Sequence, residues 1–160
     1  MISSKAIVIL TNFWNANAQI NYGLSNVNFL SDDYEKVTDY SVWSIALRDP
    51  SLDKLKHLSE MKRLDFFCPT YELLRRYKDE GDWEAYIRDY RNILISRKEK
   101  LKSWLVTVKP NHIYFLCCWE NTAGKSHCHR ELLYEAFLSS KNAREKIVPI
   151  YMHGDKVRKE

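Results

Sequence analysis

Two short segments in the C-terminal half contain most of the side chains that could perform chemistry. Residues 117–120 read Cys-Cys-Trp-Glu, and residues 127–130 read His-Cys-His-Arg. Together they supply thiols, a carboxylate, imidazoles and a guanidinium within one short stretch of chain. A thiol can act as a nucleophile, an imidazole or a carboxylate can move a proton, and a guanidinium can bind an anion.

Cys128 is the candidate nucleophile of this stretch. It falls in the first turn of a predicted helix, where the positive end of the helix dipole lowers the pKa of a thiol. Cationic neighbours lower that pKa further, and the thiolate is the reactive species. His129 could serve as acid or base near neutral pH, and Glu120 could orient this histidine or act as the base itself. Arg130 could hold an anionic substrate, because its fork of donors suits phosphate or carboxylate.

Other uses of the same residues stay open at this stage. The groups could form a polar binding site without covalent chemistry, or they could be purely structural. A zinc site could use Cys118, Cys128 and one of the flanking histidines, His127 or His129. The spacing lacks the two close ligand pairs of the strong zinc signatures, and adjacent cysteines on a strand point to opposite faces. We therefore expect no metal, and the residues indicate no particular cofactor.

Composition sets the broad class of the protein. The chain has 160 residues, of which 45% are hydrophobic and 29% charged, as in an ordinary globular domain. A single domain is expected at this length. The formal net charge of +4 permits an anionic ligand without demanding one. The sequence contains neither a dinucleotide-binding glycine pattern nor a P-loop, and it lacks the nucleophile elbow of serine hydrolases.

The sequence also bears on where the protein works. No apolar run approaches the length of a membrane-spanning helix, and no secretory signal is recognisable, so no membrane partner is expected. The four cysteines include an adjacent pair and do not resemble a disulfide framework. We therefore expect reduced thiols in the cytosol.

Hydrophobic patterning predicts alternating strands and helices. Strands are expected over residues 6–10, 40–47, 113–119 and 147–151. Helices are expected over residues 16–24, 51–61, 71–80 and 131–140, and over a long segment from residue 83 that continues or breaks near residue 96. Thr70 and Asp82 are plausible helix N-caps, and Gly81 ends the helix between them. This alternation predicts an α/β fold with a mostly parallel sheet of about four strands flanked by helices.

The motif residues resemble a known family. A hydrophobic strand ending in C-x-E at residues 116–120, followed by Cys-His-Arg at 128–130 and an apolar helix, is similar to the hallmark of the domain-of-unknown-function 488 family. Residues 10–16, 42–48 and 64–94 resemble other segments of that family. The resemblance implies a compact α/β domain but no agreed activity. It also implies that five residues belong to a shared pattern: Thr11, Glu120, Cys128, His129 and Arg130.

The predicted strands place these residues at one edge. Thr11, Arg48 and Glu120 each fall at the carboxyl end of a predicted strand, where ligands bind in open α/β sheets. If these strands are adjacent, Thr11, Arg48 and Arg130 would bind substrate near the nucleophile. The leading hypothesis is an enzyme, a hydrolase or transferase, that acts on a small anionic or nucleotide-like substrate.

Two further hypotheses accompany this one. The basic run at residues 97–102 and the many aromatic residues would suit a non-catalytic module that binds a nucleotide or nucleic acid, although such a run is more often a solvated helix face. The Cys-His-Arg turn could also be a structural lock in an interaction protein.

Overall fold

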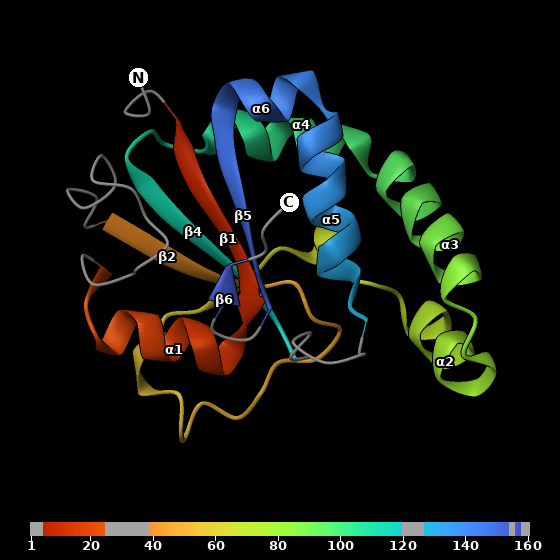
Figure 1. The fold of residues 1–160 in the computed structure, drawn as a ribbon, viewed down its shortest axis with the longest axis horizontal. Helices are drawn as coiled ribbons and strands as arrows, with labels where there is room; N and C mark the ends of the chain where they lie inside the picture. Colours follow the sequence, from red (N-terminus) through yellow and green to blue (C-terminus); the bar gives the residue numbers. More distant parts are fainter. Residues whose placement is uncertain (1–4, 25–38, 120–126, 154–155, 158–160) are drawn as a thin grey trace.

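The structure is a computed structural model that describes residues 5–24, 39–119 and 127–153, with the backbone of 156–157. A parallel sheet runs through its centre (Figure 1). The strands pair in the order β3-β2-β4-β1-β5-β6, of which the first five are parallel and β6 is antiparallel to β5. The strands are β1 (Ala6–Asn12), β2 (Asp39–Ser44), β3 (Lys62–Arg63), β4 (His112–Cys118), β5 (Ile147–His153) and β6 (Lys156–Val157). The predicted α/β fold is confirmed, and the two strands absent from the prediction are each two residues long.

Helices cover both faces of this sheet. They are α1 (Phe13–Asn21), α2 (Tyr71–Glu80), α3 (Trp83–Ser96), α4 (Lys98–Thr107), α5 (His129–Ser139) and α6 (Lys141–Lys146), with 3-10 turns η4 (Lys56–Leu58) and η5 (Asp65–Phe67). All seven residues of β1 are buried, as expected for a central strand that is covered on both sides. No helix in the described ranges is sufficiently long and apolar to cross a membrane.

The α-helix expected over residues 51–61 does not form. Leu52, Leu55 and Leu58 recur every three residues, and the chain makes consecutive turns with that period. Leu55 donates its backbone N–H to the carbonyl of Leu52 at 3.0 Å, and Leu58 donates to Leu55 at 2.9 Å. A repeat of three residues is the period of the 3-10 helix, so the spacing satisfies this tighter geometry.

Capping residues set the ends of the helices α2 and α3. The Thr70 hydroxyl accepts a hydrogen bond from the backbone N–H of Leu73 at 3.1 Å, and the Asp82 carboxylate accepts one from Ala85 at 3.0 Å. Gly81 adopts a φ of 67°, which glycine tolerates without strain, and ends α2. These boundaries agree with the prediction.

The order of the strands reverses between β4 and β1. From β1 the chain runs through α1 to β2, which lies beyond β4 in the sheet. From β4 it runs through α5 to β5, which lies beyond β1 in the opposite direction. Neighbouring strands whose connections depart in opposite directions form a topological switch point, and ligands bind there outside the carboxyl ends. The end of β4 and the start of α5 meet at this edge.

The N-cap of α2 provides a first test of the fold. Replacing Thr70 with alanine removes the side-chain acceptor for Leu73, so we expect the free energy of unfolding to fall by about 1 kcal/mol in a urea titration. Thr70→Ser keeps the hydroxyl and should stay close to the parent protein. Equal losses in both variants would contradict the capping role.

Candidate functional site

Two thiols meet where β4 ends and α5 begins. The Sγ atoms of Cys118 and Cys128 lie 2.6 Å apart, and the side chains are 1% and 4% exposed. Cys118 is the last residue of β4, and Cys128 is the N-cap of α5. The helix dipole at this position stabilises negative charge, so the site favours a thiolate.

Arg130 brings a positive charge to these thiols. Its side chain is 0% exposed, and Nη1 donates a hydrogen bond to the Sγ of Cys118 at 2.7 Å. The guanidinium carbon also lies 5.5 Å from the centre of the Tyr151 ring, a cation–π contact. Burial by itself lowers the pKa of Arg130, but the neighbouring thiol groups of Cys118 and Cys128 raise it above the usual value. Arg130 therefore stays charged and favours the ionised form of the sulfur beside it.

His129 is held in one orientation by the backbone. Its Nε2 lies 2.7 Å from the carbonyl oxygen of Ile45, which can only accept a hydrogen bond. The proton of the neutral ring must therefore sit on Nε2, which leaves the lone pair of Nδ1 as an acceptor. That Nδ1 lies 3.5 Å from the Sγ of Cys128. The geometry lets His129 take the proton of the Cys128 thiol.

The turn that presents Cys128 is fixed by its neighbours. The backbone N–H of Cys128 donates to the Glu131 carboxylate at 3.4 Å, in the reciprocal half of a capping box. The same carboxylate oxygen lies 3.2 Å from Nδ1 of His127, whose ring stacks on Trp83 with centroids 4.4 Å apart. Contacts with α3 and with the helix's own first turn thus hold the start of α5 in place.

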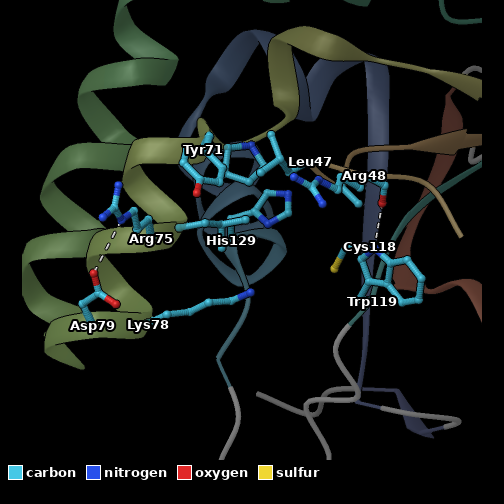
Figure 2. Close-up of a pocket in the computed structure, with 12 residues that line it drawn as sticks. Leu47, Arg48, Tyr71, Arg75, Lys78, Asp79, Cys118, Trp119 and His129 are labelled. Carbon is cyan, nitrogen blue, oxygen red and sulfur yellow. Dashed lines mark hydrogen bonds and ion pairs between the residues drawn. The ribbon is translucent and has the colours of Figure 1, made fainter.

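A pocket of about 560 Å³ opens beside this cluster. Figure 2 shows His129 in its middle, with α2 side chains on one side and Arg48, Cys118 and Trp119 on the other. The cationic side chains in its lining are Arg48, Arg75 and Lys78. An Asp79 carboxylate lies 3.8 Å from Arg75, so part of that positive charge is balanced. The remaining charges would favour an anionic ligand.

A smaller cavity of about 230 Å³ reaches the other thiol. Cys128 and His129 line it together with an aromatic wall that includes Trp83 and Tyr86. The rings of Trp83 and Tyr86 are stacked with centroids 4.9 Å apart. His129 belongs to both cavities, so it lies between the space beside Cys118 and the space beside Cys128.

Most of the predicted site residues come together. The structure places Cys128, His129 and Arg130 in one cluster and puts Arg48 in the lining of the larger pocket. Arg130 contacts the Cys118 thiol and is absent from the described lining of both cavities, so its position does not support the predicted role in binding substrate. Glu120 lies outside the described residues.

Thr11 does not join the cluster. It pairs in register with Cys117 on the neighbouring strand β4, so both side chains point to the face opposite that of Cys118. The Thr11 hydroxyl accepts a hydrogen bond from Nδ2 of Asn15 at 2.7 Å, which ties β1 to the first turn of α1. The position at the end of a strand was predicted, but the alternation along the strand turns this side chain away from the thiols.

Cys118 belongs to the cluster, and the sequence predicts it only as a candidate zinc ligand. The alternation of side chains along a strand could have identified it, because only one of two adjacent cysteines can face α5. Arg75 and Lys78 were also missed. They belong to a helix distant in the sequence, and no local pattern indicated that α2 would close the pocket.

The other two cysteines, Cys68 and Cys117, are buried apart from this pair. Burial raises the pKa of the Cys68 thiol to about 11, and it raises the pKa of Cys117 well above its ordinary value. Both thiols therefore stay protonated at neutral pH.

The cluster at the start of α5 also offers metal-ligand types, since the donor atoms of Cys118, Cys128 and His129 all lie within 4.8 Å of one another. Sulfur and imidazole nitrogen are the ligands that Zn²⁺ prefers.

Comparison with known proteins gives one family match. The DUF488-N3a model, described as the active DUF488-N3 subclade, matches residues 46–141, more than half of the chain. This range includes α2, the end of β4 and all residues of the thiol cluster, whereas Thr11 lies before it. Neither the curated proteins nor the solved structures contain a significant match to the chain.

Selective alkylation tests whether Cys128 is more reactive than Cys68. At pH 7 a thiol with a pKa of about 11 is ionised in about one molecule in ten thousand, so Cys68 should react slowly with iodoacetamide. Cys128 should react first, as followed by peptide mass spectrometry over time. As the pH rises toward 11, the thiolate fraction of Cys68 grows and the contrast should shrink. A Cys128 that reacts no faster than Cys68 at pH 7 would contradict the activated-thiol interpretation.

Proposed function

The chain belongs to the domain-of-unknown-function 488 family, and we propose that it is an enzyme that acts on a small anionic or nucleotide-like substrate. Cys128 is the nucleophile in this proposal, and His129 is its base. The observation that carries the proposal is the hydrogen bond from His129 to the Ile45 carbonyl, because it leaves Nδ1 facing the Cys128 thiol. A base held in this tautomer beside a thiol is the arrangement that nucleophilic catalysis needs.

The reaction would proceed in two displacement steps. In the first, Nδ1 of His129 takes the proton of Cys128, and the sulfur attacks the electrophilic atom of the substrate. The bond to the leaving group breaks, and His129 returns the proton to that group. In the second, water or an acceptor hydroxyl displaces the sulfur while His129 again moves the proton. Water as acceptor makes the enzyme a hydrolase, and another acceptor makes it a transferase.

Arg130 has a supporting role in this mechanism. It is buried beside Cys118 and donates to that sulfur, so its charge acts on the thiol pair from the protein interior. A thiolate on either cysteine is stabilised by this charge, which raises the fraction of reactive sulfur. Binding the substrate falls instead to the cations that line the pocket.

The larger pocket supports the substrate class. Arg48 and Lys78 supply positive charge, and Arg guanidinium groups bind phosphate well. Tyr71 and Trp119 lie in the same lining and are 54% and 42% exposed, so flat aromatic surface is available for a base to stack on. A pocket of about 560 Å³ falls within the usual range for a small-molecule site. We place this thiol chemistry in the cytosol, where cysteines stay reduced.

A non-catalytic nucleotide- or nucleic-acid-binding module is the second candidate. The low exposure of both thiols favours it, since a substrate would need some movement of α2 or of the start of α5 to reach them. The basic run at residues 97–102, which could contact phosphates but is more often a solvated helix face, contributes less, because Arg97 donates to the backbone carbonyls of Asp65 and Cys68. Binding of an oligonucleotide that weakens steeply with salt would favour this candidate.

Nucleotide binding can be tested with AMP as the probe. We expect calorimetry at low salt to detect binding, and Arg48→Ala or Lys78→Ala each to weaken it about tenfold through the loss of one phosphate contact. Lys141→Ala, on the exposed surface of α6, is the matched control and should bind as the parent does. Absence of AMP binding, or equal weakening by all three substitutions, would exclude the pocket as a nucleotide site.

Catalysis can be tested by replacing the proposed nucleophile and its base and measuring turnover. A panel of nucleotides and other phosphate esters incubated with the protein should yield one substrate that is turned over. Cys128→Ser should then lower kcat about a thousandfold or more, and His129→Gln should lower it about a hundredfold or more. Cys117→Ser, on the opposite face of β4, should keep full activity. If AMP binds but no panel member is turned over, the binding module is the better description.

A further inference from the structure

The close approach of Cys118 and Cys128 carries a consequence for oxidation chemistry. Their sulfur atoms are 2.6 Å apart, and a disulfide bond is about 2.05 Å long, so only a small movement separates the pair from a covalent link. The two residues lie on different elements, the last position of β4 and the N-cap of α5. Among the four cysteines, all within the described residues, this is the pair in direct contact.

The charges around the pair favour the reactive form of sulfur. Arg130 donates to the Sγ of Cys118 at 2.7 Å, and Nδ1 of His129 lies 3.5 Å from the Sγ of Cys128. One thiol therefore has a cation beside it, and the other has a base. Each cysteine also borders a cavity, Cys118 the larger one and Cys128 the smaller one, so a small oxidant has a route to the pair.

We propose that Cys118 and Cys128 form a redox-active pair, in which a peroxide oxidises the two thiols to a disulfide and thereby switches the site off. The bond consumes Cys128, which is the nucleophile of the proposed enzyme. The regulatory part of this inference therefore rests on the proposed function, whereas formation of the disulfide does not.

The oxidation balances with hydrogen peroxide as the oxidant. The Cys128 thiolate attacks one peroxide oxygen, the O–O bond breaks, and the released hydroxide takes up a proton to become water. Cys128 is then a sulfenic acid. The Cys118 thiolate attacks its sulfur, the S–O bond breaks, and the second hydroxide is protonated to water. The two sulfurs lose two electrons in total, the peroxide gains them, and a dithiol reductant reverses the change.

A zinc ion is the competing use of the same donors. The three donor groups of Cys118, Cys128 and His129 would suit Zn²⁺ by type. The Arg130 guanidinium lies against Cys118, however, where it would repel a cation. This contact therefore favours the redox pair.

The test is oxidation of the purified, reduced full chain with hydrogen peroxide, followed by non-reducing digestion and mass spectrometry. The expected product is a link between positions 118 and 128, with a mass about 2 Da below that of the reduced peptides, that dithiothreitol removes. The link should persist in Cys117→Ser and should be absent from Cys118→Ser and Cys128→Ser. Circular dichroism of each variant shows whether it is folded, and the Cys117→Ser protein allows assignment where the two adjacent cysteines share a peptide.

Two results would overturn the redox pair. One is that peroxide converts the cysteines to sulfinic or sulfonic acids without the intramolecular link. The other is that the protein is purified with one equivalent of zinc that protects both thiols until a chelator removes it. The regulatory part is tested separately, by turnover of the identified substrate before and after oxidation. A disulfide that forms without loss of turnover would refute the switch and leave the redox pair standing.

Discussion

The contact between the Arg130 guanidinium and the Cys118 sulfur is the interaction on which the site depends. A fully buried cation is costly unless an acceptor or a negative charge lies beside it. In this structure the acceptor is sulfur, which places an ionisable thiol where a carboxylate is more usual. The same contact joins the end of β4 to the first turn of α5 and thereby sets the position of Cys128. Packing of the guanidinium over the Tyr151 ring extends this link to β5.

The topology explains why the candidate site lies at this edge of the sheet. β4 lies between β2 and β1, so its carboxyl end faces loops from both neighbours. The long connection from β3 to β4 carries α2, which covers the opening and contributes cationic side chains to the pocket. One wall of the pocket is therefore a helix that lies far in the sequence from the thiol pair.

Local patterns predicted most of the fold and part of the site. The apolar runs of β1 and β4 and the caps at Thr70 and Asp82 identified their elements because these signals act within a few residues. The two-residue strand β3 could not be predicted, since its pairing with β2 depends on contacts between distant residues, which a local sequence pattern does not show. The contact between Arg130 and Cys118 could not be predicted for a similar reason. Sequence shows that a guanidinium is present at a helix start, but only packing decides whether it faces the ligand or the core.

The peptide group of Ile45 has a consequence for the durability of the site. Its N–H donates to the carbonyl of Cys117 at 2.9 Å, while its own carbonyl accepts from His129 at 2.7 Å. The tautomer of His129 is thus set by main-chain atoms, and every residue type except proline supplies both the N–H and the carbonyl. Random substitution at position 45 can disturb packing, but it cannot delete the acceptor. Substitutions at position 45 should therefore leave the protonated nitrogen of His129 unchanged.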